Sequence, residues 1–90
     1  MQTLEQALAD LANEDMVKAF LIDLCTPAER HALAERWQVA QLLDEGKLSY
    51  RDISAKTGVS TTTIGRVARF LKDEPHGGYR FVLDSMKEKS

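Results

Sequence analysis

Apolar side chains recur three and four positions apart along almost the whole chain, and this period constrains the fold more than any other feature of the sequence. Alternation of apolar and polar residues, the pattern of a half-exposed strand, never extends beyond a few positions. The pattern predicts an all-α fold. A chain of 90 residues forms one domain, 1–90, with a core so thin that we expect a partner subunit to complete it.

Capping motifs and glycines divide this helical pattern into segments. Thr26-Pro27-Ala28-Glu29 combines an N-cap hydroxyl, a proline at the first helical position and a glutamate that closes a capping box. A long helix therefore begins there, and Gly46 ends it. Ser49 and Ser60 each begin a shorter helix, and Gly58 separates the two. The other segments are an apolar stripe (Leu4, Leu8, Leu11), a helix from about Asn13, a break over Asp73–Gly78 and a last helix.

The two short helices from Ser49 to Lys72 have the pattern of a helix-turn-helix. Gly58 supplies the positive φ that the turn requires, and the small Ser54 lets the second helix approach the first. Four aliphatic residues are expected to hold the helices together: Ile53, Val59, Ile64 and Val67. Because this motif places its second helix in the major groove of DNA, we predict a DNA-binding element.

Charge is distributed unevenly along the chain, although the net charge is only −2. Residues 1–46 hold nine acidic and three basic side chains, whereas residues 47–72 hold six basic side chains and one acidic side chain. This block of cations coincides with the helix-turn-helix and is typical of a nucleic-acid-binding element on an acidic scaffold. The alternative is a solvated basic face that serves solubility alone.

Candidate DNA contacts lie on the early and outward positions of the second short helix. Threonine hydroxyls can donate to or accept from base edges, and threonine methyl groups can contact the thymine methyl. Arg51 is long enough to reach a guanine, whereas the later cations suit phosphates. The candidate DNA-binding residues are Arg51, Lys56, Ser60, Thr61, Thr62, Thr63, Gly65, Arg66, Arg69 and Lys72.

The sequence offers no pattern for catalysis. His31 and His76 stand 45 residues apart, Cys25 is the only cysteine, and neither a glycine-rich phosphate loop nor a metal-ligand spacing occurs. We therefore predict that the chain is not an enzyme and binds no cofactor or metal ion. The segment Met1–Glu5 lacks the features of a signal peptide and no run of about 18 apolar residues occurs, so we expect a cytoplasmic protein without a membrane partner.

The stretch from Leu24 to Lys72 resembles the tryptophan repressor superfamily. Within that superfamily, the segment Ser60–Val67 is closer to the YerC/YecD branch than to the tryptophan-sensing repressor itself. The resemblance covers about half the chain strongly and the rest in helix order. The matching positions are Thr26-Pro27-Ala28-Glu29-Arg30, Ala32-Leu33, Arg36, Leu42-Leu43, Gly46, Ser49, Arg51, Gly58, Thr63-Ile64 and Arg66.

The resemblance implies a six-helix subunit in an intertwined homodimer whose two reading heads bind a palindromic operator on double-stranded DNA. It implies base contacts by Arg51 and by Thr61–Thr63, and a phosphate contact by Lys72. Arg36 and Arg66 match the two arginines that hold the indole of the tryptophan corepressor. A DNA-binding dimer without a second domain acts most simply by blocking polymerase, so we predict a repressor.

Two positions depart from the tryptophan-sensing pattern. Val67 stands where the sensors have glycine, and Phe70 stands where they have serine. Together with Arg36 and Arg66 they define a possible ligand pocket, which we expect the Phe70 ring to fill so that tryptophan is not needed. Two alternatives are a repressor that senses another metabolite through Arg36 and Arg66, and a protein–protein interaction module on a helix-turn-helix scaffold.

Overall fold

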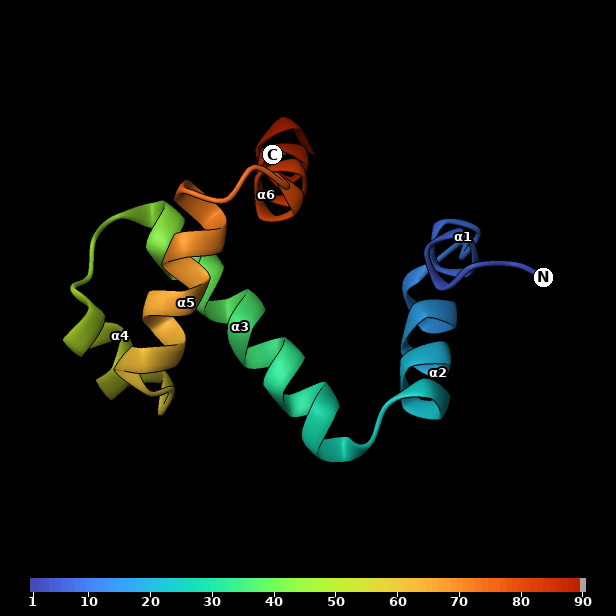
Figure 1. Ribbon diagram of the computed structural model, residues 1–90, viewed down its shortest axis with the longest axis horizontal. Helices are drawn as coiled ribbons and strands as arrows, with labels where there is room; N and C mark the ends of the chain where they lie inside the picture. The colour runs from blue at the N-terminus through green and yellow to red at the C-terminus, as the bar shows by residue number, and fades with distance from the viewer. Residues whose placement is uncertain (90) are drawn as a thin grey trace. The chain divides into compact units, whose positions relative to one another are not determined.

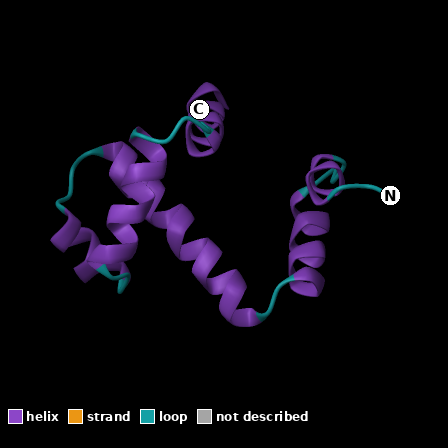
Figure 2. Ribbon diagram, viewed as in Figure 1, coloured by secondary structure: helices purple, strands orange, loops and turns teal. Residues whose placement is uncertain are grey.

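The computed structural model describes residues 1–89, and every regular element in this part of the chain is an α-helix (Figures 1 and 2). The helices are α1 (Leu4–Ala9), α2 (Glu14–Leu24), α3 (Pro27–Glu45), α4 (Tyr50–Thr57), α5 (Thr61–Lys72) and α6 (Gly78–Lys89). The predicted all-α fold and the predicted order of helices are therefore confirmed. Among the described residues, no helix combines the length and apolar character needed to cross a membrane.

Side-chain caps set the helix boundaries where the sequence pattern placed them. The Asn13 side chain accepts a hydrogen bond from the Met16 backbone N–H at 3.0 Å and begins α2. Thr26 and Glu29 form the predicted reciprocal capping box of α3, at 2.8 and 3.1 Å. Donation from the Thr26 backbone and side chain lowers the pKa of Glu29 below its usual value. Gly46, with φ of 71°, follows the last residue of α3.

The chain divides into two compact units, Met1–Ala32 and the remainder from Leu33 onward, and α3 contributes residues to both. Neither α1 nor α2 in the first unit has a buried residue. Their large apolar side chains are instead substantially exposed: Leu4, Leu8, Met16, Ile22 and Leu24. Leu4 and Leu8 of the first predicted apolar stripe lie on α1, whereas Leu11 lies after the end of this helix. Much of the apolar surface of α1 and α2 is exposed in the single chain.

The hydrophobic core lies in the second unit and joins three helices. It consists of Val39, Ala40 and Leu43 from α3, Ile53 from α4, Val59 from the turn, and Ile64, Val67 and Ala68 from α5. The four aliphatic residues predicted to hold the helix-turn-helix together are all buried in this cluster. The core therefore fixes α4 and α5 on the carboxyl-terminal half of α3.

Candidate nucleic-acid interface

The turn between α4 and α5 is built by local hydrogen bonds around Gly58. This glycine has φ of 78°, in the left-handed region, and its N–H donates to the Ser54 carbonyl at 2.8 Å. The Thr57 hydroxyl donates to the Ile53 carbonyl at 2.7 Å and accepts from the Val59 N–H at 3.1 Å. Sequence reasoning identified Gly58 but missed Thr57, because a side chain that bonds both ways across a turn leaves no distinctive spacing.

The amino end of α5 presents two threonines outward and holds a third one back. The Ser60 hydroxyl accepts from the Thr63 N–H at 3.2 Å and donates to the Thr63 hydroxyl oxygen at 3.1 Å. Thr63 is half-buried, whereas Thr61 and Thr62 are exposed. Gly65 lies one turn further along, and no neighbouring atom would lie within 4 Å of a Cβ at this position. Nothing inside the subunit therefore requires a glycine there.

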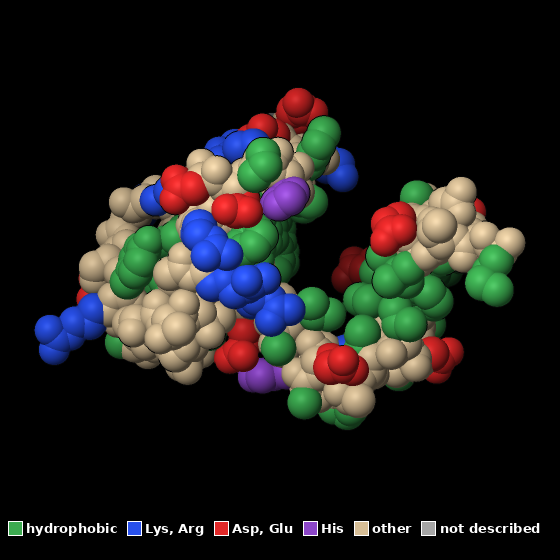
Figure 3. Space-filling model, in the orientation of Figure 1, with side chains coloured by type: hydrophobic (Ala, Val, Ile, Leu, Met, Phe, Trp, Pro, Cys, Tyr) green, Lys and Arg blue, Asp and Glu red, His purple; other side chains and the backbone are tan. Residues whose placement is uncertain are grey.

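The candidate cations of the helix-turn-helix are all exposed: Arg51, Lys56, Arg66, Arg69 and Lys72. The visible face of the space-filling view shows Lys and Arg side chains gathered on the second unit (Figure 3). Two of the cations also contact Phe70, since the guanidinium carbons of Arg66 and Arg69 lie 4.4 and 5.0 Å from its ring centroid. Arg69 additionally lies 4.0 Å from the carboxylate of Glu74.

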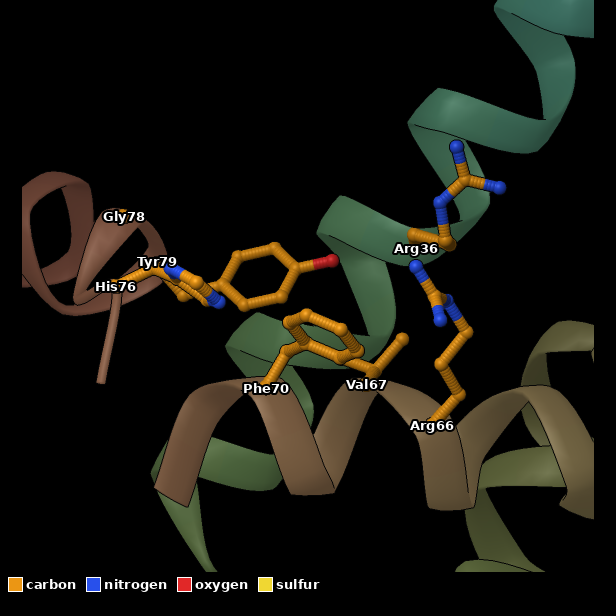
Figure 4. Close-up of a pocket in the computed structure, with 7 residues that line it drawn as sticks. All are labelled: Arg36, Arg66, Val67, Phe70, His76, Gly78 and Tyr79. Carbon is orange, nitrogen blue, oxygen red and sulfur yellow. The ribbon is translucent and has the colours of Figure 1, made fainter. Parts of the chain in front are cut away.

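A cavity of about 340 Å³ lies next to the carboxyl-terminal half of α5 (Figure 4). All four residues predicted for a ligand pocket line it: Arg36, Arg66, Val67 and Phe70. Phe70 forms part of the wall, and open space remains beside its ring, although we expected the ring to fill the pocket. No carboxylate belongs to the lining, so the charged groups at its edge are the two guanidiniums and, when protonated, His76.

Three further lining residues come from the connector after α5 and from the start of α6: His76, Gly78 and Tyr79. The His76 ring stacks on Phe70 with centroids 6.1 Å apart, and the Tyr79 ring stacks on Trp37 of α3 at 6.4 Å. In Figure 4 the hydroxyl end of Tyr79 points from α6 toward α3. Sequence reasoning missed these residues because the placement of α6 depends on contacts distant in sequence.

The geometry of α4, the Gly58 turn and α5, with its exposed threonines and cations, defines the chain as a helix-turn-helix protein. Comparison with known proteins identifies the group within this class. The family model described as Trp repressor protein matches residues 1–87. The chain belongs to the Trp repressor family.

Individual relatives agree with this assignment. The uncharacterized protein YerC of Bacillus subtilis is 45% identical over 69 residues, a match that spans 77% of this chain and 64% of YerC. The match thus spans slightly less than two thirds of YerC. A Trp operon repressor homolog of Aliivibrio salmonicida is 38% identical over 80 residues, covering 89% of this chain and 74% of that protein.

A solved structure shares the fold over most of the chain. The crystal structure of a candidate Trp repressor from Staphylococcus aureus superimposes with a TM-score of 0.84 and 36% identity, covering 93% of this chain and 82% of that one. The predicted resemblance and the predicted fold class are therefore confirmed. The family consists of transcriptional regulators and not of enzymes, which confirms the corresponding prediction at the level of the family.

Proposed function

We propose that this chain is a cytoplasmic transcriptional repressor that binds a palindromic DNA operator as a homodimer, with α5 in the major groove. The observation that carries the proposal is the exposed amino end of α5. Thr61 and Thr62 present hydroxyl and methyl groups to solvent, while Ser60 and Thr63 are engaged in the cap. Hydroxyl and methyl groups at the start of a recognition helix suit the edges of base pairs.

The cations divide into two proposed roles. Arg51 lies in the first turn of α4 and reads a base, because a guanidinium can bond to guanine in a bidentate manner. Lys56 and Lys72 lie at the carboxyl ends of α4 and α5 and contact phosphates, together with Arg66 and Arg69. Gly65 leaves room for the close approach of the sugar-phosphate backbone. Specificity would then rest on few residues and affinity on many.

The uncovered apolar side chains of α1 and α2 support the homodimer. Leu4, Met16 and Leu24 are between 44 and 49% exposed, and the first unit of the chain contains no buried apolar residue to compensate. Interlocking with a second copy would bury this surface in one composite domain that includes residues 1–90. The two DNA-binding helices of the dimer would lie one helical turn of DNA apart, roughly 34 Å, and the two-fold symmetry of the dimer would require a palindromic operator.

Binding without tryptophan is supported by the packing at the far end of α5. Phe70 is contacted by Arg66 and by the His76 ring, so residues of the chain itself supply packing on the inner side of α5. The open volume beside Phe70 favours a second candidate function, in which the repressor senses a metabolite other than tryptophan between Arg36 and Arg66. No small-molecule cofactor is needed for the first candidate.

Selection of genomic fragments followed by a salt titration tests the proposal. Fragments that the protein retains should share a near-palindromic site, and the logarithm of the affinity should fall linearly with the logarithm of salt concentration. A protein–protein module on the same scaffold would retain no common site and show no such slope. A scrambled duplex of equal length and composition is the matched control, and binding to it should be weaker by a factor of at least about 1,000.

A further inference from the structure

One carboxylate near the end of α3 binds two cations of α6. Asp44 Oδ1 accepts a hydrogen bond from Arg80 Nη2 at 2.9 Å, and Asp44 Oδ2 lies 3.0 Å from Lys87 Nζ. The two cations are seven residues apart, which is about two helical turns, so both occupy one face of α6. The Asp44 side chain is only 15% exposed. A single, largely covered carboxylate thus joins two helices that are distant in sequence.

The chemistry of this cluster differs from that of an isolated surface ion pair. Hydrogen bonds from Lys87 and Arg80 lower the pKa of Asp44, so the carboxylate stays charged. Arg80 also donates from Nε to Asp84 at 3.0 Å, on its own helix, which holds the guanidinium in place. An exposed single ion pair contributes little to the stability of a fold. A covered carboxylate that loses both of its cations, in contrast, keeps the cost of its desolvation without any stabilising partner.

The start of α6 and the connector before it carry aromatic residues that contact α3 and α5. Tyr79, which precedes Arg80, stacks on Trp37 of α3. The connector before α6 contains His76, whose ring stacks on Phe70 of α5. A shift of α6 along α3 would therefore disturb both aromatic contacts. The helices α5 and α6 are also packed against each other. The orientation of α5 relative to α3 therefore depends on the position of α6.

We propose that Asp44 is a positioning residue that fixes α6 on α3 through Arg80 and Lys87. By this contact it holds α5 in the orientation in which the helix can enter the major groove. The inference rests on the proposed function, because it assigns a role to α5 on DNA. In this proposal Asp44 acts on DNA binding only through the docking of α6. The device needs no ligand, and it lies outside the cavity beside Phe70.

A DNA-free measurement tests the docking of α6. Trp37 is the only tryptophan of the chain and stacks directly on Tyr79, so its emission is sensitive to a change in this contact. Asp44→Asn, which keeps the shape of the side chain, should shift the Trp37 emission while the helical circular dichroism remains that of the wild type. Asp84→Asn is the matched control, because it also removes one carboxylate from Arg80 but leaves the α3 to α6 link intact.

Operator binding tests the effect of Asp44 on α5. The expected result for Asp44→Asn is weaker binding, although the loss of a negative charge acts in the opposite direction. Removing an acidic charge by itself strengthens binding to DNA. We nevertheless expect Asp44→Asn to bind the selected operator on the order of tenfold more weakly than the wild type, and Asp84→Asn to bind at least as tightly as the wild type.

The proposal is overturned if folded Asp44→Asn has the Trp37 emission of the wild type, or binds the operator as tightly as Asp84→Asn does. Should Asp44→Asn fail to fold, Lys87→Gln breaks half of the clamp, with Lys89→Gln as its charge-matched control on the same helix. Equal affinities and emissions of those two variants would then reject the role of the clamp. If the wild type retains no DNA, the proposed function fails, while the emission measurement still decides whether Asp44 docks α6.

Discussion

Arg51 and Lys72 are both exposed cations of the helix-turn-helix, yet we assign them different contacts on DNA. Arg51→Ala should cost on the order of 1 to 3 kcal/mol per half-site on the operator and much less on random DNA, because a base contact is lost. Lys72→Ala should weaken both kinds of binding alike and reduce the salt slope by about one. Fluorescence anisotropy with operator and random duplexes separates the two. Equal losses for Arg51→Ala on both duplexes would reduce its role to electrostatics.

Asp44 makes the stability of the fold depend on pH in a direction set by its pKa. Hydrogen bonds from Lys87 and Arg80 lower the pKa of the folded state, so the ion pairs contribute fully above the unfolded value near 3.8. The contribution is lost as the pH falls through the lowered folded-state pKa. Urea unfolding of the wild type and Asp44→Asn should therefore differ at pH 6, and this difference should shrink below pH 3.8. A pH-independent difference would contradict the account.

The sequence predicted single residues well where their partners are close in the chain. Thr26 with Glu29, and Ser60 with Thr63, are three residues apart, and helix geometry fixes such contacts. The Asp44 cluster joins positions 36 residues apart, and no local pattern distinguishes Asp44 from the other acidic residues of α3. Tyr79 was missed in the cavity wall for the same reason, because its ring stacks on Trp37, which is distant in sequence.

Replacement by alanine is expected to change the stability of the fold in opposite directions at two glycines of the helix-turn-helix. Gly58 has φ of 78°, so Gly58→Ala should destabilise the fold by about 1 to 2 kcal/mol although space for a methyl group exists. Gly65 lies within α5 without a neighbour inside 4 Å, so Gly65→Ala should stabilise the fold by about 0.5 to 1 kcal/mol. Urea unfolding measures both effects.

The same Gly65→Ala variant tests whether DNA approaches α5 closely. If the backbone of the operator passes over Gly65, the added methyl group should weaken operator binding even though the protein is more stable. Unchanged operator affinity would show that the space above Gly65 is not used by DNA.

The inner face of α5 provides a prediction about the cavity. Val67→Gly combined with Phe70→Ser removes a buried aliphatic side chain and the ring that stacks on His76. The double variant should bind the operator more weakly without ligand, because α5 loses its packing on that side. Part of the loss should be recovered with an indole compound that occupies the enlarged cavity. Wild-type affinity of the double variant would show that Phe70 does not hold α5 in place.

Helix boundaries were predictable because capping is local chemistry, whereas the arrangement of the helices was only partly so. The core of α3, α4 and α5 follows from the apolar periodicity, as the burial of Ile53, Val59, Ile64 and Val67 confirms. The open space beside Phe70 was not predicted, because a volume depends on the angle between helices and on where α6 docks. Sequence periodicity determines the faces of helices but does not determine these distances.

At the scale of the whole molecule, the exposed faces of α1 and α2 predict an obligate homodimer. Light scattering at micromolar concentration should give twice the 10.1 kDa mass of the chain. The double variant Leu4→Glu with Met16→Glu places a charge on the apolar face of α1 and another on that of α2. We expect this variant to lose both dimerisation and folding. A well-folded monomer of the wild type would contradict the intertwined arrangement.

An operator titration with and without tryptophan tests whether this helix-turn-helix protein reads a specific DNA sequence without the amino acid. The labelled palindromic operator recovered from the genomic selection is titrated by anisotropy at fixed salt concentration, and tryptophan binding is measured in parallel by calorimetry. We expect a dissociation constant of about 10⁻⁸ M or tighter that tryptophan leaves unchanged. Specific binding that arises only when tryptophan is present would contradict it.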